Sequence, residues 1–368
     1  MRNSVGVGLI GCGAISGEYL RNSKKFPQLR IVACADLNRQ AAEDRAREFE
    51  IPRVCTVEEL LEDRNVDLVL NLTVPKAHAP LALAALKAGK HTYLEKPLGA
   101  SRQQGSEIIS LAEKNNRVVG CAPDTFLGSG QQTARSVIDR GLIGRPVAFT
   151  AMMMIPGHES WHPSPEFYYE PGGGPLFDMG PYYLTSLLNL LGGVKRVGGM
   201  ASIAIPKRTI TSKPKHGKII EVQTADHVVG VMEFENGAVG SLIQSFATHH
   251  PPYPACSIVI YGTEGTLQVP DPNHFDGPVK IRGNNEPDWK EIPPVTSHKY
   301  GRAVGIAEMV DAILAGRTPR ASGQQAMMVL DLMDGIMASS AGGKFIEPAK
   351  TYRRPEAMPT RSEFGSFV

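Results

Sequence analysis

Cysteine is scarce in this sequence, and its few copies lie far apart. No Cys-x-x-Cys pair occurs among the five cysteines, Cys12, Cys34, Cys55, Cys121 and Cys256. Without such pairs, the sequence indicates neither a zinc cage nor a disulfide framework. Isolated cysteines are typical of small buried side chains in a protein from a reducing compartment.

Long apolar runs and an excess of charge are also missing. No apolar run reaches the roughly 18 residues that a membrane span needs, and no charged-then-apolar leader opens the chain. The formal net charge is only +2, which argues against nucleic acid or a membrane surface as a partner bound through bulk charge. We therefore expect a cytoplasmic protein with neither kind of partner.

A change of pattern along the chain predicts two domains. Up to Pro123, short apolar runs alternate with helical segments, which is typical of a parallel, doubly wound sheet. Further on, the runs 226–234 and 238–246 flank Glu235-Asn236-Gly237, a strong hairpin signal. The expected division is 1–123, 124–345 and a C-terminal tail over 346–368, which is expected to be an extended arm that could wrap a neighbouring subunit.

The first strand, Val5–Ile10, leads into a glycine-rich turn. The turn reads Gly11-Cys12-Gly13-Ala14-Ile15-Ser16, and a helix can begin directly after it. Such a turn lets the backbone approach a pyrophosphate, which the free N–H groups of the helix then bind. The next strand ends in Asp36, where an acidic side chain can bind the ribose hydroxyls. Together these features predict a dinucleotide cofactor.

Two residues bear on which dinucleotide is bound. The charge of Asp36 would repel a 2′-phosphate and therefore favours NAD. Arg39 follows three residues later and could pair with that phosphate, so NADP stays possible.

Four motifs resemble the Gfo/Idh/MocA oxidoreductases, the family of glucose–fructose oxidoreductase and inositol dehydrogenase, over roughly residues 5–345. They are Gly11-Cys12-Gly13, Thr73-Val74-Pro75 with His78, Glu95-Lys96-Pro97, and the run from Gly172 to Gly180. The resemblance implies an N-terminal Rossmann domain and a C-terminal α/β domain with an open, mostly antiparallel sheet. It also implies NAD or NADP, a sugar-like or polyol substrate, and a homodimer or homotetramer built through the C-terminal sheet. The resulting cofactor-binding candidates are Gly11, Gly13, Ala14, Ile15, Asp36, Arg39, Thr73, Pro75, His78, Glu95, Lys96 and Pro97.

Lys96 is the strongest catalytic candidate. It follows the predicted strand 91–94, and ligands bind beyond the carboxyl ends of the strands in open α/β sheets. A lysine at that point can hydrogen-bond a reacting oxygen, and burial can bring its pKa toward neutrality. Pro97 is commonly a cis residue in the family that the motifs resemble, where Glu95 helps to place the cofactor.

Asp178 and Tyr182 complete the catalytic set. Their i,i+4 spacing predicts that both lie on one face of a helix, with Asp178 as its N-cap. The family resemblance implies that Asp178 orients a substrate hydroxyl and that a histidine acts as acid and base four residues later. Tyr182 occupies that position here. A free tyrosine has a pKa of about 10, so we expect Lys96 and Tyr182 to share the proton transfer.

The remaining substrate candidates come from loops. Residues 156–174 are aromatic and rich in proline and glycine, and long irregular segments inside a domain are usually functional. Trp161 and His162 are the best candidates there, because aromatic rings suit the apolar faces of sugars. Asp124 and Phe126 are expected at the mouth of the cleft. His158 and His162 are not expected to form a zinc pair, because no helical pattern surrounds them; the sequence predicts no metal site.

Three functions remain open. The first is an NAD-dependent dehydrogenase or reductase acting on a secondary hydroxyl of a sugar, glycoside or polyol. The second is an NAD-retaining glycosidase that works by transient oxidation and elimination. The third is a non-catalytic sensor of NAD or sugar, against which the presence of Lys96 and Asp178 speaks. The lysine-rich segment Lys207–Lys218 is most simply a solvated loop.

Overall fold

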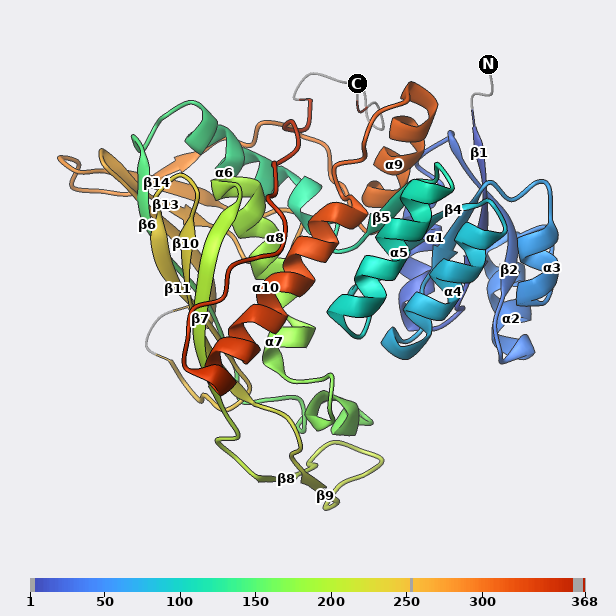
Figure 1. Ribbon diagram of the computed structural model, residues 1–368, viewed down its shortest axis with the longest axis horizontal. Helices are drawn as coiled ribbons and strands as arrows, with labels where there is room; N and C mark the ends of the chain where they lie inside the picture. Colours follow the sequence, from blue (N-terminus) through green and yellow to red (C-terminus); the bar gives the residue numbers. More distant parts are fainter. Residues whose placement is uncertain (1–3, 252–253, 360–366, 368) are drawn as a thin grey trace. The chain divides into compact units, whose positions relative to one another are not determined.

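The computed structural model describes residues 4–251, 254–359 and 367, and it divides into two compact units (Figure 1). Unit 1 contains Met1–Gly128, Thr296–Leu330 and Pro355–Val368, and unit 2 contains Ser129–Val295 and Asp331–Arg354. Unit 1 therefore includes residues 296–330, which the sequence analysis placed in the second domain. No helix of the described residues is long and apolar enough to cross a membrane.

Unit 1 contains a five-stranded sheet in the order β2-β1-β3-β4-β5, in which every pairing is parallel. Its strands are β1 (Val5–Ile10), β2 (Leu29–Ala35), β3 (Leu68–Asn71), β4 (His91–Leu94) and β5 (Val119–Cys121). All residues of β1, β3 and β5 are buried, as expected for a parallel sheet covered on both faces. The sequence-based prediction of a doubly wound sheet is thus confirmed.

The helices of unit 1 are α1 (Ala14–Ser23), α2 (Arg39–Phe49), α3 (Val57–Glu62), α4 (Pro75–Lys87), α5 (Arg102–Lys114), the 3₁₀ turn η1 (Thr125–Leu127) and α9 (Val304–Ala315). Two of them, α3 and α5, begin after a side-chain N-cap. Thr56 and Glu59 form a reciprocal capping box before α3, and Ser101 accepts from the Gln104 N–H before α5. The apolar faces of α4 and α5 pack together over β4 and β5 through a cluster that includes Leu86, Leu94 and Ile108.

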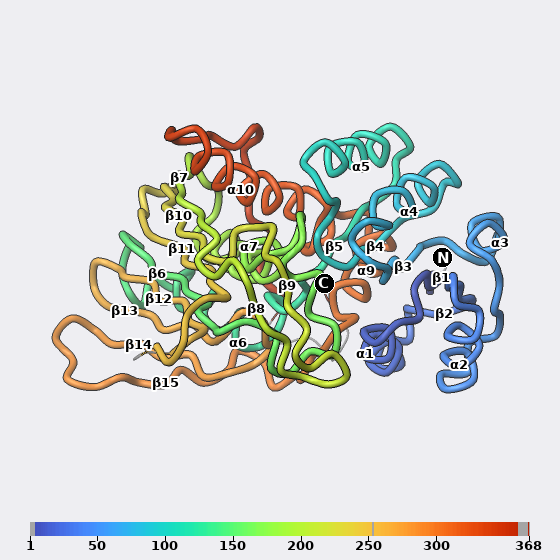
Figure 2. The backbone as a smooth tube through the Cα atoms, turned by 90° about the horizontal axis from the view of Figure 1, so that it is seen from below, coloured from blue at the N-terminus to red at the C-terminus, as the bar shows by residue number. Residues whose placement is uncertain are grey.

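Unit 2 contains an eight-stranded sheet in the order β15-β14-β13-β12-β6-β11-β10-β7, which Figure 2 shows strand by strand. Its strands are β6 (Pro146–Met154), β7 (Val194–Ser202), β10 (His227–Phe234), β11 (Val239–Ser245), β12 (Cys256–Gly262), β13 (Gly265–Val269), β14 (Val279–Gly283) and β15 (Lys290–Ile292). The turn 235–237 joins β10 to β11 as predicted. The sheet is antiparallel except between β6 and β11, so the expected mostly antiparallel sheet is confirmed.

The helices of unit 2 are α6 (Ser129–Asp139), α7 (Pro175–Asp178), α8 (Gly180–Leu191) and the second part of α10 (Gly323–Gly342); η2 (Pro165–Tyr169) is a 3₁₀ turn. The helix α7 is short and ends before Met179, which has φ −104° and ψ −25° and separates it from α8. Asp178 ends α7, whereas Met179 precedes α8 without any side-chain cap. The predictions that Asp178 is an N-cap and shares one helix face with Tyr182 are therefore wrong.

The lysine-rich segment 207–218 is not simply a solvated loop. Its first residues form β8 (Lys207–Thr209), which pairs with β9 (Ile219–Glu221) in a two-stranded sheet (Figure 1). Within β8, Lys207 is exposed but Arg208 is buried, because alternate residues of a strand face opposite sides. The positive charge of Arg208 is thereby brought into the interior of unit 2.

The C-terminal segment packs against its own chain. Ile346 forms an antiparallel bridge with Val197, and Arg354 forms an ion pair with Asp139. Arg320 donates to the carbonyls of Glu356, Ala357 and Phe367. Positions 360–366 and 368 of the predicted arm lie outside the described residues.

Candidate functional site

Unit 1 carries the candidate cofactor site at the carboxyl end of β1. Gly11 has φ +99°, and a Cβ there would lie 2.7 Å from the Leu72 carbonyl carbon, so only glycine fits. A Cβ on Gly13 would meet nothing within 4 Å, which leaves open space beside the turn. The first turn of α1 has no side-chain cap and no acidic residue. Its free N–H groups therefore suit a pyrophosphate.

Asp36 links the glycine-rich turn to the end of β2. One carboxylate oxygen accepts from the Cys12 N–H at 2.7 Å, and the other accepts from the Asn38 N–H at 2.8 Å. A carboxylate has about four lone-pair sites, so each oxygen can still accept from a ribose hydroxyl. The residues of unit 1 thus fit a dinucleotide.

Two neighbours refine the cofactor prediction. Arg39 forms an exposed ion pair with Glu43 at 2.9 Å, which directs its guanidinium along α2. Ser16 occupies the position of the third glycine in the dinucleotide-binding pattern Gly-x-Gly-x-x-Gly. It is completely buried, and its hydroxyl donates to the Gly13 carbonyl at 2.6 Å. A small residue therefore maintains the close packing at this position.

The segment Glu95-Lys96-Pro97 follows β4, and its Lys96–Pro97 peptide bond is cis, as expected. Glu95 accepts from the Tyr19 hydroxyl and from the Lys96 N–H, both at 2.9 Å. These bonds fix the backbone at Lys96, whose side chain is partly exposed at the carboxyl edge of the parallel sheet.

His78 supports this turn from within unit 1. The side chain is completely buried, and its ring nitrogens lie 2.7 Å from the Pro97 carbonyl and 2.9 Å from the Thr73 carbonyl. Thr73 also donates through its N–H and hydroxyl to Asn71, and Pro75 begins α4. We infer that His78 holds the Thr73 and Pro97 segments together instead of exposing its own ring to a cofactor.

Asp124 and Phe126 do not lie at an open surface. Asp124 is completely buried, and its carboxylate accepts from Arg302 at 3.2 Å and from the Gly305 N–H at 3.1 Å. Burial raises the pKa of Asp124, and the contacts with Arg302 and Gly305 oppose this rise. Phe126 is also buried. The prediction that Asp124 and Phe126 lie at the mouth of the cleft therefore needs correction. Residues 296–305 cover Asp124, and the Asp124 carboxylate accepts a hydrogen bond from the start of α9.

Unit 2 carries the remaining catalytic candidates. Asp178 is partly exposed at the end of α7, whereas Tyr182 is buried in the first turn of α8. Because the two residues lie in different helices, α7 sets the position of Asp178. This helix packs against β10 and β11.

His158 is the residue that the sequence analysis undervalued. Its Nε2 atom lies 3.8 Å from Asp178 Oδ2, and the side chain is 8% exposed. Within the part of the chain that the structure describes, neither ring nitrogen has a hydrogen-bond partner. Burial lowers the pKa of His158, while the charges of Asp178 and Glu159 oppose this effect. The signal in the sequence was Gly157-His158-Glu159 shortly after a strand. The sequence analysis considered His158 only as one member of a possible zinc pair with His162.

Aromatic rings surround His158. Tyr168 lies against it with ring centroids 3.9 Å apart and the rings tilted by 33°, and Trp161 and Phe246 form T-shaped contacts at 5.3 and 4.5 Å. His162 joins the same cluster through Trp161 and Tyr168. Trp161 is 60% exposed, so it offers a ring surface to a ligand. The described residues hold no group of three or more metal-ligating side chains.

The parallel pairing of β6 and β11 explains how this cluster forms. The carboxyl ends of parallel strands meet at the same sheet edge. The Ile155 N–H donates to the Ser245 carbonyl, and the Thr248 N–H donates to the Ile155 carbonyl. The segment after β6, with His158, is thus joined to the segment after β11, with Phe246.

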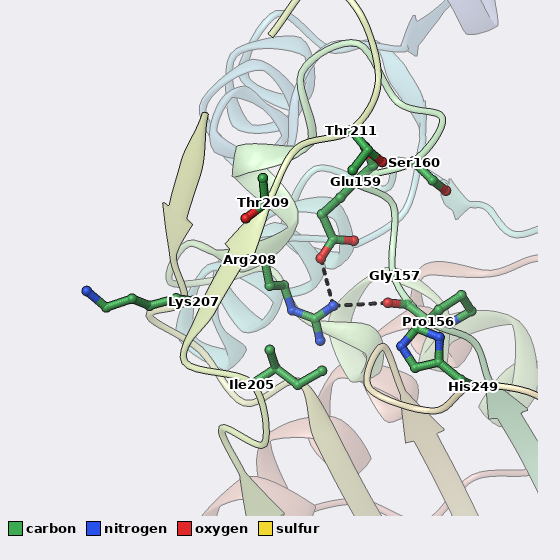
Figure 3. A pocket seen from close by; sticks show the side chains of 10 residues that line it. All are labelled: Pro156, Gly157, Glu159, Ser160, Ile205, Lys207, Arg208, Thr209, Thr211 and His249. Atoms are coloured by element: carbon green, nitrogen blue, oxygen red, sulfur yellow. Dashed lines mark hydrogen bonds and ion pairs between the residues drawn. The ribbon is translucent and has the colours of Figure 1, made fainter. Parts of the chain in front are cut away.

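Arg208 anchors the segment that carries His158 (Figure 3). It donates to the Pro156 carbonyl and to Glu159 at 3.0 and 2.7 Å, and to Asp226 and the Phe246 carbonyl at 2.7 and 2.8 Å. The side chains of Arg208 and Asp226 are 3% and 0% exposed. A pocket of about 380 Å³ adjoins this anchor; its lining is Pro156, Gly157, Glu159, Ser160, Ile205, Lys207, Arg208, Thr209, Thr211 and His249.

Comparison with known proteins matches residues in each of the two units. Residues 5–122 match the oxidoreductase family with an NAD-binding Rossmann fold, and residues 131–268 match the GFO/IDH/MocA C-terminal domain. The chain belongs to the Gfo/Idh/MocA oxidoreductase family. As a member of this family it is an NAD-binding oxidoreductase of the sugar and polyol class.

Relatives of this Gfo/Idh/MocA protein cover nearly its whole length. It is 25% identical to 1,5-anhydro-D-fructose reductase of Ensifer adhaerens over 92% of this chain and 97% of the relative. It is 26% identical to trans-1,2-dihydrobenzene-1,2-diol dehydrogenase of Mus musculus over 83% and 85% of the two chains. Its fold is similar to levoglucosan dehydrogenase in complex with NADH and levoglucosan, with a TM-score of 0.81 and 21% identity over 94% and 100%.

Replacing Arg208 tests the anchor. We expect Arg208→Met to lower the free energy of unfolding by roughly 3–5 kcal/mol, because Asp226 would be left buried without its counter-charge. Lys207→Met is the matched control, since Lys207 is exposed and its ion pair with Glu221 should contribute about 0–1 kcal/mol. Urea unfolding measures both; equal effects of the two substitutions would refute the anchoring role.

Proposed function

We propose that this protein transfers hydride between NAD and a secondary hydroxyl of a cyclic sugar, glycoside or polyol. The observation that supports this most directly is Lys96, fixed by the Glu95–Lys96 hydrogen bond at the carboxyl edge of an NAD-binding sheet. Ligands of open α/β sheets bind at this edge. When bound, NAD supplies the electron acceptor for the oxidation of the carbinol carbon.

The chain's own residues bind and polarise the alcohol. We propose that the Lys96 ammonium donates to the reacting oxygen and stabilises its developing negative charge, and that Asp178 accepts a hydrogen bond from a substrate hydroxyl. Tyr182 is the third member of the proposed catalytic set. Because Asp178 is partly exposed and Tyr182 is buried, Asp178 is the better candidate for direct contact with the substrate.

The substrate class follows from the exposed rings of unit 2. Trp161 and Phe167 are both more than half exposed, beside His162 and Tyr168. Flat aromatic surfaces of this kind suit the C–H faces of a ring with hydroxyl groups at its edge. The names of the relatives fit this class, since they act on 1,5-anhydro-D-fructose, levoglucosan and a cyclic diol. We therefore propose a cyclic substrate with neighbouring hydroxyl groups.

We also propose that a second copy of the chain covers the open face of the large sheet. Met200, Val229, Ile243 and Met152 are paired neighbours in β7, β10, β11 and β6, so their side chains form one apolar row. Met200 is 78% exposed. An apolar, exposed sheet face of this kind marks an interface, and a two-fold axis lets one face cover its own copy.

The assembly is tested by Met200→Glu. We expect the wild type to be a dimer or tetramer and the variant to dissociate, because the carboxylate would be desolvated within the interface. Light scattering measures the mass. Leu314→Glu, on an exposed site of α9 in unit 1, is the control and should assemble like the wild type. A monomeric wild type would contradict the proposal.

Catalysis is tested with NAD and levoglucosan, myo-inositol, glucose and aryl glucosides, followed by NADH absorbance. We expect NADH to form with at least one cyclic polyol, and Lys96→Met to lower kcat by about 10²–10⁴-fold while NADH still binds. Lys114→Met, on the exposed last turn of α5, is the control and should leave kcat unchanged. Release of an aglycone without NADH would favour a glycosidase, and binding without any turnover would favour a sensor.

A further inference from the structure

The unsatisfied imidazole of His158 has a geometry that structural packing does not explain. Its Nε2 atom and Asp178 Oδ2 are 3.8 Å apart, too far for a direct hydrogen bond. Both ring nitrogens lack hydrogen-bond partners within residues 4–251, 254–359 and 367. Leaving a buried polar group unpaired costs about 1–3 kcal/mol, so an orphan of this kind calls for a ligand or a function.

The separation of the two groups leaves room for ligand oxygens between them. When polar groups lie beyond about 3.5 Å, a water or a ligand oxygen can lie between them. An ionised carboxylate and the unprotonated nitrogen of a neutral imidazole both accept hydrogen bonds, and a hydroxyl has only one proton to donate. We propose that His158 and Asp178 bind two neighbouring hydroxyls of the ligand, one each, and that Nε2 of His158 takes the proton of the reacting hydroxyl during oxidation. This inference rests on the proposed function.

The surroundings hold the imidazole ready for this role. The Tyr168 ring lies tilted against the imidazole, and Trp161 and Phe246 form T-shaped contacts with it. On either side of His158 along the chain, the Pro156 carbonyl and Glu159 are held by Arg208. The His158 ring is therefore fixed from several directions, while its Nε2 atom faces the partly exposed Asp178. Packing without a function would not require a nitrogen at that point.

The electrostatics keep His158 neutral at pH 7. Burial lowers its pKa most strongly, His162 and Arg208 lower it further, and Asp178 and Glu159 oppose them. A neutral imidazole accepts a proton through one nitrogen. In the oxidation step the hydroxyl proton would move to Nε2 as the O–H bond breaks and the C=O bond forms, while a bound NAD would accept the carbinol hydrogen as hydride. His158 then returns that proton to solvent, and in the reverse reaction it donates one.

This assignment also answers why Tyr182 stands where the family resemblance implies histidine. His158 supplies the imidazole from a different segment, at the end of β6 instead of the start of α8. A neutral imidazole can accept a proton near neutral pH, whereas a free tyrosine, with a pKa of about 10, would first have to lose its own proton. Tyr182 then contacts the ligand without having to become a phenolate.

Two substitutions of His158 separate binding from proton transfer. In His158→Gln, the side-chain amide still forms hydrogen bonds but cannot take up a proton, so we expect kcat to fall by about 10²-fold or more with KM little changed. In His158→Phe, which suits the surrounding rings, KM should rise as well. His216→Gln replaces an exposed histidine and is the control. Affinity for NADH and the thermal midpoint should stay at wild-type values in the variants.

The pH profile supplies a readout that a structural role would not move. Oxidation needs neutral His158, so kcat/KM should fall as the pH drops through the pKa of His158, which lies below the usual value of about 6.5. This fall of kcat/KM at acidic pH should be absent in His158→Gln. If His158→Gln retains both the wild-type kcat and the fall of kcat/KM at acidic pH, the inference is overturned.

Nuclear magnetic resonance of the His158 imidazole tests ligand binding without turnover. We expect levoglucosan or myo-inositol to shift its signals saturably in the NADH complex, and Asp178→Asn to lower its pKa further by removing a negative charge. Saturable shifts without any NAD reduction would refute the proposed function but support the hydroxyl site. Turnover of these compounds without a shift at His158 would refute the hydroxyl site alone.

Discussion

One buried guanidinium holds several segments of unit 2 together. Arg208 joins β8 to the segment after β6, to Asp226 and to the Phe246 carbonyl. Glu159 and Asp226 compensate its charge where water is excluded, and this makes the arrangement costly to break. Because Glu159 follows His158 directly, the same ion pair that stabilises unit 2 also fixes the imidazole beside Asp178.

In unit 1, by contrast, the candidate cofactor site must stay accessible to NAD. Gly11 permits the close approach of the backbone, and the first turn of α1 keeps its N–H groups uncapped. Asp36 steadies the glycine-rich turn through the Cys12 N–H while retaining lone pairs for a ribose. The candidate NAD site thus relies mainly on backbone groups, whereas the proposed chemistry relies on a few side chains, Lys96 and Asp178 among them.

The sequence predicted most of what depends on local patterns. The βαβ alternation and the 235–237 hairpin were both predicted and both confirmed, because each depends on residues close in the chain. The predictions failed where a side chain contacts residues that are far away in the sequence. Asp124 is covered by residues 296–305, and its partners Arg302 and Gly305 are 178 and 181 residues away in the sequence. The sequence pattern placed Arg208 in a lysine-rich loop, but its burial depends on the pairing of β8 with β9.

The site shows the same limit. Lys96 could be placed from its strand end, but the pairing of His158 with Asp178 depends on the parallel contact of β6 with β11, which no local pattern reveals. The central claim is that the carbinol hydrogen moves directly to NAD. It is tested by mass analysis of the cofactor after reaction with a polyol deuterated at its carbinol carbons. The account predicts NADH that carries deuterium; NADH without the label would contradict it.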